Sequence, residues 1–195
     1  IQDYISEIQK QYATGVAREH TYRPALQQLL ATMLPHLVVS NEPARQACGA
    51  PDYILQSKEG NIPVAFVEAK NINDPDLAGR NKHKEQFERY RLSLDNIIFT
   101  DYLDCLLYEK GEFVDSVRMA EFKGDKLVAL KDNFGKFEHM IARFGDAHPQ
   151  KITSSAKLAE IMAGKARLLA DVIEQTFTQG GGDGNLAGQL VAFKD

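Results

Sequence analysis

The chain has 195 residues, of which 44% are hydrophobic and 9% aromatic, and it carries 23 Lys and Arg against 27 Asp and Glu. This composition excludes a disordered, collagen-like or coiled-coil chain, and the length suits one sizeable core with an added element. The net charge of −4 excludes a basic surface overall, so any contact with nucleic acid must come from a local patch.

The first two thirds of the chain predict a mixed α/β domain. Helical spacing of apolar residues predicts a short helix around residues 4–12 and a second one that begins near Pro24 and ends at Pro35. One further helix is expected over residues 82–94. Strand-like runs are expected at residues 37–40, 52–57, 64–69, 96–100, 105–108 and 113–117. Read in order, with a last hairpin turning at Gly111, these elements predict a three-layer arrangement.

The last third of the chain predicts helices and a linker. Apolar stripes indicate helices over residues 134–144 and 158–177, and the Gly-rich run after them reads as a linker. We therefore expect a domain at 1–130, a helical appendage or connector at 131–178, and a linker with the start of a following segment at 179–195. On this basis the chain is expected to be part of a longer polypeptide.

Sequence features also bear on where the protein works. No apolar run approaches the length of about 20 residues that a membrane span needs, and no secretory signal opens the chain. Cys48 and Cys105 form no CxxC pair, which suits a reducing compartment. A cytoplasmic protein without membrane contact is expected.

Two acidic residues are expected to meet in a β-hairpin. If the turn is centred on Gly60, residues whose numbers sum to 120 face each other, which pairs Asp52 with Glu68. Carboxylates so placed on one face have Cβ atoms about 5 Å apart and repel each other unless something neutralises them. Mg²⁺ would do so, because it prefers oxygen ligands and keeps positions for water and phosphate. A slip of one residue would send Glu68 to the opposite face.

Lys70 is expected beside these acids. The two-residue period of a strand puts it on the face of Glu68 and turns Ala69 toward the core. Its ammonium group is expected to lower the pKa of the carboxyl groups and to orient an attacking water, which suits phosphodiester hydrolysis. In the alternative interpretation, Asp52 only marks a turn, and Glu68 and Lys70 form an ion pair on a solvated face. The apolar run before Glu68 favours the functional interpretation, because charges that end a central strand usually need a partner.

Three motifs in order, Gly49-Ala50-Pro51-Asp52, Glu68-Ala69-Lys70 and Gln86-x-x-x-Tyr90, resemble the PD-(D/E)xK nuclease superfamily and its QxxxY variant. With residues 19–26 and 98–102, they are similar to the amino-terminal nuclease domain of single-chain restriction-modification enzymes. The resemblance covers roughly residues 15–125. It implies a restriction-endonuclease-like core of order αβββαβ, in which helices flank a mixed central sheet, with appended C-terminal helices.

The resemblance also implies a metal site. Asp52, Glu68 and the backbone carbonyl of Ala69 would hold Mg²⁺, and Mn²⁺ is expected to substitute for it. Glu19 would join the metal ligands as an acid that precedes the core. An exposed Glu at a helix start is equally well explained as a partner of the helix dipole.

Two further roles follow from the resemblance. Lys70 would be the catalytic lysine, and Gln86 would reach metal-bound water or substrate. Gln86 and Tyr90 are four residues apart on one helix face, so both side chains can point toward the predicted metal site. Tyr90 also lines up with apolar neighbours, which predicts that it packs in the core.

Basic residues cluster around the expected third helix. Contact with DNA phosphates is one interpretation, and it would position a duplex without reading its sequence. A solvated helix face is the alternative, because Glu85 and Glu88 dilute the cluster. The candidates for phosphate contact are Lys82, Lys84 and Arg89, among a group that also includes Arg80, His83 and Arg91.

Together these features predict a Mg²⁺-dependent DNA endonuclease, the cleavage module of a restriction-modification enzyme. The resemblance implies double-stranded DNA as partner, a methyltransferase or specificity region in the same full-length chain, and transient dimerisation for double-strand cleavage. A non-catalytic DNA-binding or coupling domain, and a nuclease of repair or mobile-element transfer, remain as alternatives. Asp101 and Asp104 are explained by a turn between strands. The variant Asp52→Ala is expected to lose cleavage, to stay folded and to gain slightly in stability.

Overall fold

The computed structural model describes residues 1–41, 51–60, 62–146, 159, 162–163 and 166. The chain divides into two compact units, one of Ile1–Pro43 with Pro51–Lys151, and one of Ala44–Ala50 with Ile152–Asp195. In the second unit the described residues are helical and fall within the helix expected over 158–177. The expected linker at 179–195 and the Gly49-Ala50 part of the first motif lie outside the described residues.

The first unit contains the helices and strands that the sequence predicts up to residue 118, each with ends within two residues of the expectation. A short 3-10 helix, η1 (Glu19–Tyr22), precedes α2, and another, η3 (Lys131–Asn133), precedes α4. The α-helices and strands are α1 (Gln2–Tyr12), α2 (Arg23–Met33), β1 (Leu37–Asn41), β2 (Tyr53–Ser57), β3 (Pro63–Ala69), α3 (Lys84–Ser93), β4 (Asn96–Thr100), β5 (Asp104–Glu109), β6 (Glu112–Arg118), β7 (Ala120–Lys123), β8 (Lys126–Ala129) and α4 (Phe134–Gly145).

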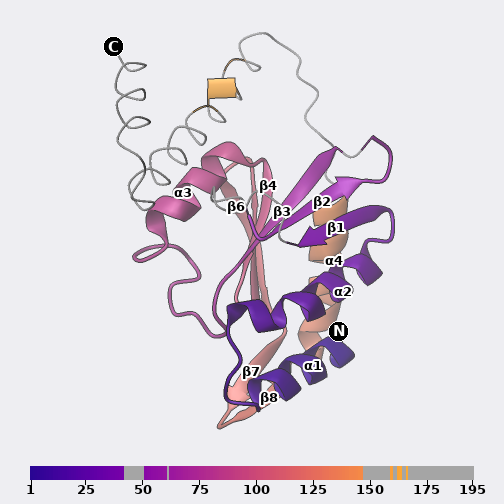
Figure 1. Ribbon diagram of the computed structural model, residues 1–195, viewed down its shortest axis with the longest axis vertical. Helices are drawn as coiled ribbons and strands as arrows, with labels where there is room; N and C mark the ends of the chain where they lie inside the picture. The colour runs from indigo at the N-terminus through magenta and orange to yellow at the C-terminus, as the bar shows by residue number, and fades with distance from the viewer. Residues whose placement is uncertain (42–50, 61, 147–158, 160–161, 164–165, 167–195) are drawn as a thin grey trace, which may run out of the picture. The chain divides into compact units, whose positions relative to one another are not determined.

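The strands β1 to β6 form one mixed sheet in sequential order. Neighbours are antiparallel except β3 and β4, which are parallel. Helix α3 explains the exception, because parallel neighbours need a crossover connection whereas antiparallel ones can be joined by a tight turn. Such a turn joins β5 to β6, where Lys110 and Gly111 have φ of 52° and 84°. The predicted mixed sheet is confirmed (Figure 1).

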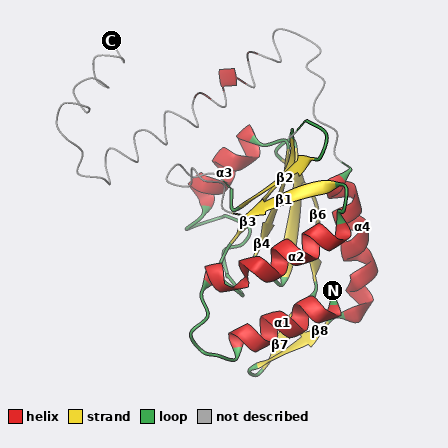
Figure 2. Ribbon diagram, turned by 45° about the vertical axis from the view of Figure 1, so that its right-hand side comes forward, coloured by secondary structure: helices red, strands yellow, loops and turns green. Residues whose placement is uncertain are grey.

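Helices cover both faces of this sheet. Apolar residues of α1, α2 and α4 form the larger core with one face, and α3 closes a smaller core on the other face (Figure 2). Strand β4 lies between the two layers, so that Ile98 belongs to the larger core and Ile97 and Phe99 to the smaller one. All five of its residues are buried, as expected for a central strand between two helical layers.

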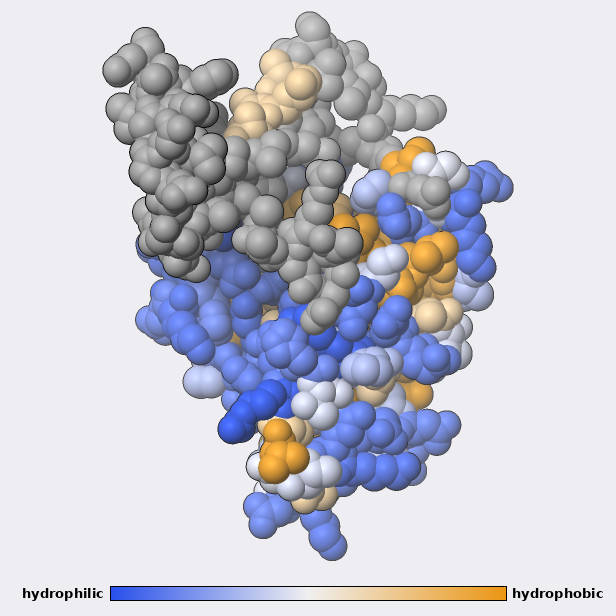
Figure 3. Space-filling model, viewed as in Figure 1, coloured by the Kyte–Doolittle hydropathy of each residue, from blue (hydrophilic) through white to orange (hydrophobic). Residues whose placement is uncertain are grey.

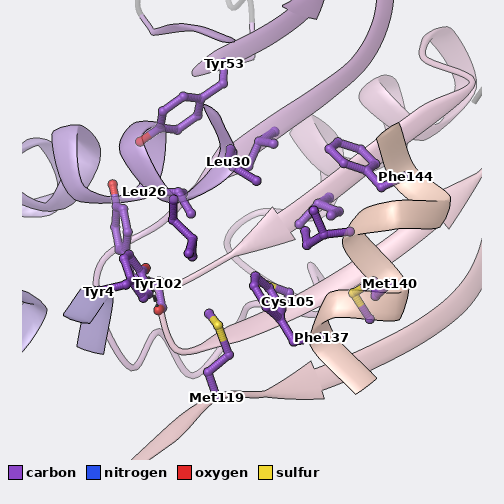
Figure 4. Packing of buried hydrophobic residues seen from close by; sticks show 14 of the residues in the cluster. Tyr4, Leu26, Leu30, Tyr53, Tyr102, Cys105, Met119, Phe137, Met140 and Phe144 are labelled. Atoms are coloured by element: carbon purple, nitrogen blue, oxygen red, sulfur yellow. Dashed lines mark hydrogen bonds between the residues drawn. The ribbon is translucent and has the colours of Figure 1, made fainter. Parts of the chain in front are cut away.

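Helix α4 belongs to the larger core and not to an appendage. Its buried residues pack with Leu30 of α2 and Cys105 of β5 in one cluster (Figure 4). A Cβ added to Gly145 would lie 2.3 Å from Leu34, which shows how closely α4 approaches α2. The expected boundary at residue 130 therefore does not coincide with the edge of this unit, which runs to Lys151. The buried residues of α4 are Phe137, Met140, Ile141, Phe144 and Gly145.

The sequence did not predict the hairpin of β7 and β8, which forms a separate two-stranded sheet. It packs against α1, where the rings of Tyr12 and Phe122 lie 4.7 Å apart and the Gln9 side chain accepts a hydrogen bond from the Leu127 N–H. The strands are four residues each, too short to show a clear period.

Hydrophilic residues make up most of the described surface in the view of Figure 3, and hydrophobic residues there form small separate groups. Among the helices that the structure describes, none could cross a lipid bilayer as an apolar segment.

Candidate active site

The hairpin of β2 and β3 brings Asp52 and Glu68 to the same end of the sheet. Tyr53 pairs with Val67, so the register follows the predicted sum of 120. Asp52 directly precedes β2 and therefore stands beside Glu68. Next to the turn Gln56 pairs with Pro63, which is a sum of 119, and the register shift between residues 55 and 56 gives the sum of 120 at the acidic end.

Successive residues of β3 point to opposite layers. Ala65, Val67 and Ala69 belong to the larger core, which leaves Glu68 and Lys70 on the face that α3 covers. Lys70 is the first residue after the strand, and its N–H donates to the carbonyl of Thr100 at 2.8 Å. The site therefore lies where β3 ends, between the sheet and α3.

Lys70, Glu68 and Gln86 form a closed hydrogen-bonded triangle. Lys70 Nζ donates to Glu68 Oε1 at 2.7 Å and to Gln86 Oε1 at 2.8 Å. Gln86 Nε2 donates to the same Glu68 oxygen at 2.8 Å and to the Tyr90 hydroxyl at 3.4 Å. Tyr90 is fully buried in the smaller core, whereas Gln86 reaches the acids, so the structure arranges the two residues as their spacing predicts. Their roles stay predictions.

Asp52 is held by groups from two directions. The Ala69 N–H donates to its Oδ2 at 2.8 Å, and Arg23 Nη2 donates to its Oδ1 at 2.6 Å. Arg23 Nη2 also donates to Glu19 Oε1 at 3.2 Å. Glu19 thus reaches the site through Arg23, not by direct contact with Asp52.

Arg23 is a site residue that the sequence reasoning missed. Only 4% of this residue is exposed, although it carries a charge. Its spacing of four from Glu19 on a helical segment indicates an ion pair, but no local pattern connects it to Asp52, which is 29 residues away.

Burial controls the electrostatics of the site. Glu68 is 4% exposed, and burial followed by the nearby charge of Asp52 raises its pKa to about 7, although Lys70 acts in the opposite direction. Burial also raises the pKa of Asp52, against the Ala69 N–H and the Arg23 guanidinium. Lys70 lowers the pKa of both carboxyl groups, as expected, but both pKa values are raised overall. Desolvation of the acids outweighs the attraction of the cation.

The acids have the chemistry of a hard-cation site. Carboxylate oxygens are the ligands that Mg²⁺ prefers, and the mutual repulsion of Asp52 and Glu68 is the stress that a bound cation would relieve. Across the ranges that the structure describes, no group of three or more His, Cys, Asp or Glu side chains could hold a metal. A Mg²⁺ ion at this site would therefore be held by the carboxylates of Asp52 and Glu68 and by one backbone oxygen. The Ala69 carbonyl stays the predicted source of that oxygen.

The residues predicted to contact phosphate lie on α3 or directly before it, and none of them has a side-chain hydrogen bond to Asp52 or Glu68 among the described residues. Lys82 and Lys84 are exposed, and within the described chain neither makes a side-chain hydrogen bond or ion pair. Arg89 is half-buried. His83 is buried with a ring nitrogen 3.1 Å from Asp74, which excludes it from an exposed phosphate contact.

The acids at the start of β5 have structural partners, as expected for a turn. Asp101 Oδ1 accepts the N–H groups of Leu103 and Asp104 at 3.0 and 2.7 Å. Asp104 in turn receives three hydrogen bonds from the Arg118 guanidinium. The carboxyl group of Asp101 is explained by the connection between β4 and β5, and that of Asp104 by its pairing with Arg118 of β6.

Comparison with known proteins supports the fold. No protein-family model matches the sequence, and no curated protein matches it. The fold is similar to that of DrdV in a cryo-EM structure of a DrdV–DNA complex, with a TM-score of 0.56 and 22% identity over 76% of this chain. The chain spans 14% of the length of the DrdV chain. The chain has a restriction-endonuclease-like α/β fold, as the sequence predicts.

Proposed function

We propose that this chain is a Mg²⁺-dependent DNA endonuclease domain that hydrolyses phosphodiester bonds. The observation that carries the proposal is the meeting of Asp52, Glu68 and Lys70 at one end of the β2–β3 hairpin, with Gln86 closing the group from α3. The shared fold with DrdV, which was solved in a complex with DNA, supports DNA as the substrate.

Each residue of the group has a role in this proposal. Asp52 and Glu68 would hold the cation, which when bound stabilises negative charge on the phosphate and makes a water more acidic. Lys70, whose ammonium is fixed by Glu68 and Gln86, is in place to align the attacking water and to offset charge on the phosphate oxygens. Arg23 and the Ala69 N–H fix the orientation of Asp52.

The proposal extends to partners that the resemblance implies. This domain would be the cleavage module of a restriction-modification enzyme, with a methyltransferase or specificity region in the same full-length chain and a cytoplasmic location. Mn²⁺ would replace Mg²⁺, since both accept carboxylate oxygens. One site cuts one strand, so double-strand cleavage would need transient dimerisation.

One observation favours a second candidate function, a non-catalytic DNA-binding or coupling domain. Each acid already has a cationic partner in the chain, Arg23 at 2.6 Å from Asp52 and Lys70 at 2.7 Å from Glu68. A site that is satisfied by internal ion pairs could serve structure alone. The two functions differ in whether DNA is cut.

The test is cleavage of supercoiled plasmid by the purified 195-residue chain with millimolar Mg²⁺, with Mn²⁺, and with EDTA. We expect nicked or linear product with either metal and none with EDTA. Lys70→Ala should reduce the cleavage rate on the order of 10²-fold or more while DNA binding is retained. Lys126→Ala, at an exposed position of β8, is the matched control and should cut at the wild-type rate.

Two outcomes would contradict the proposal. A chain that binds DNA but leaves it intact with both metals supports the second candidate. A Lys70→Ala variant that cuts as fast as wild type removes the lysine from the chemistry.

A further inference from the structure

A concave site lies on α3, formed with the loop before the helix and with β5. Its cavity has a volume of about 400 Å³. The residues that matter to its chemistry are Gly79, Arg80, Lys84, Glu88, Arg91 and Tyr108.

This pocket opens on a different side of α3 from the acids. Lys84, Glu88 and Arg91 follow one another at spacings of four and three residues, so they share one helix face. Gln86 and Tyr90 lie about half a turn away on the helix, on the face that meets Glu68 and Lys70. The pocket is therefore separate from the candidate active site.

The pocket is strongly cationic for a chain with a net charge of −4. Three of its side chains are basic and only Glu88 is acidic. Arg80 and Lys84 are exposed, and in the part of the chain that is described neither side chain has a hydrogen bond or ion pair. Cations so close together without a matching set of acids favour an anion between them.

Arg91 makes a cation–π contact with an aromatic cluster. Its guanidinium lies 5.3 Å from the centroid of the Tyr108 ring, and Phe99 and Phe113 each meet that ring edge to face. This contact restrains the guanidinium beside the pocket, where its N–H groups can donate to an anion. Less conformational entropy is then lost when a ligand binds.

Gly79 allows the loop to line this pocket. Its φ is 62°, and a Cβ there would lie 2.4 Å from the Phe87 ring. Glycine alone can therefore hold the loop, and with it Arg80, against α3.

We infer that this pocket binds a phosphate group of the DNA backbone through Arg80, Lys84 and Arg91. The choice of DNA as the source of the phosphate rests on the proposed function. Guanidinium groups match phosphate oxygens with paired hydrogen bonds, and an ammonium adds a point charge. Of the three residues that the sequence predicts for phosphate contact, Lys84 is retained, whereas Lys82 and Arg89 do not line the pocket.

The test measures binding of the 195-residue chain to a labelled duplex by fluorescence anisotropy, in EDTA so that cleavage plays no part. Affinity is recorded over a series of salt concentrations for wild type, Arg80→Gln/Lys84→Gln and Arg91→Gln. Lys126→Gln is the matched control, an exposed lysine outside the pocket. Inorganic phosphate and a mononucleotide are added as competitors in separate arms. Thermal unfolding checks each variant, and Arg91→Lys keeps the charge if Arg91→Gln fails to fold.

Each lost phosphate contact should make the negative slope of log K against log salt shallower by about 0.9 and weaken binding on the order of tenfold at about 0.1 M salt. The slope of the double variant should therefore be shallower by about twice that amount, and Lys126→Gln should match wild type. Wild-type affinity and slope in the pocket variants would overturn the inference, as would a wild-type chain that does not bind DNA. Competition by millimolar mononucleotide as strong as that by duplex would assign the pocket to a free nucleotide instead.

These outcomes are independent of those for cleavage. If the pocket variants bind DNA normally and wild type cuts plasmid, the phosphate pocket is refuted and the nuclease function stands. If the pocket variants lose binding but wild type never cuts, the phosphate pocket stands and the nuclease function is refuted.

Discussion

The ionisation of Glu68 makes the stability of the metal-free protein depend on pH. Burial and Asp52 raise the pKa of Glu68 from 4.5 to about 7. The folded protein therefore binds this proton more tightly than the unfolded chain does. Its contribution to stability is fully present below about pH 4.5 and is lost as the pH rises through about 7. At 1.36 kcal/mol per pKa unit, the total loss is about 3 kcal/mol.

The variant Glu68→Gln isolates this effect, because glutamine carries no charge at any pH and keeps an oxygen that can accept from Lys70 and Gln86. Its free energy of unfolding relative to wild type should rise by up to about 3 kcal/mol between about pH 4.5 and pH 8. The measurement is urea unfolding of both proteins in EDTA at several pH values. Glu112→Gln, on the exposed edge of β6, is the control and should differ from wild type by less than about 0.5 kcal/mol.

A difference between Glu68→Gln and wild type that stays constant from pH 4.5 to pH 8 would refute the reasoning, since it would mean that burial does not disfavour the carboxylate. Mg²⁺ provides a second readout. At about pH 8 added Mg²⁺ should stabilise wild type by relieving the repulsion from Asp52, and it should stabilise Glu68→Gln much less.

Two further predictions concern the packing around the site. Asp52→Ala should lower the free energy of unfolding, measured by urea unfolding, by about 2 kcal/mol, because the nearly buried Arg23 loses its closest acid. This value replaces the sequence-based expectation of a small gain in stability. A variant as stable as wild type, or more stable, would contradict it. Gly79→Ala should cost about 2–4 kcal/mol, because alanine is strained at a φ of 62° and its Cβ would overlap Phe87. Gly135→Ala in α4 is its control, since nothing lies within 4 Å of that Cβ, and it should gain about 0.5–1 kcal/mol.

The contacts of the two acids suggest how the site stays folded without a cation. Asp52 and Glu68 each contact a different basic side chain, and neither basic side chain is more than about a tenth exposed. Removing one partner from a buried pair costs more than the pair contributes, because the other charge stays buried alone. Stability measurements and cleavage measurements on the same variants are therefore needed to separate structural from chemical roles.

The sequence alone determined the local features of the site. The strand period of two put Glu68 and Lys70 on one face, and the turn at Gly60 brought Asp52 to within one residue of Glu68. The register shift between residues 55 and 56, which the sequence did not predict, completes the pairing of the two acids. The periods of helices and strands similarly predicted the elements up to residue 118. These features depend on the local geometry of the backbone, so residues close together in the sequence are enough to predict them.

Other features depend on which segments pack together. The apolar stripe of α4 predicts a helix, but it does not predict which surface that helix packs against. In the structure α4 packs in the larger core. The short hairpin of β7 and β8 owes its place to α1, more than a hundred residues earlier in the chain.

Only the tertiary structure decided the charge state of the site. Helix α3 covers the face of Glu68 and brings Gln86 to it, and Arg23 arrives from α2 to hold Asp52. The raised pKa of Glu68 follows from desolvation by these layers, a quantity that no local pattern contains. Register and face are properties of the chain's own geometry, whereas burial of a charge is a property of everything packed around it.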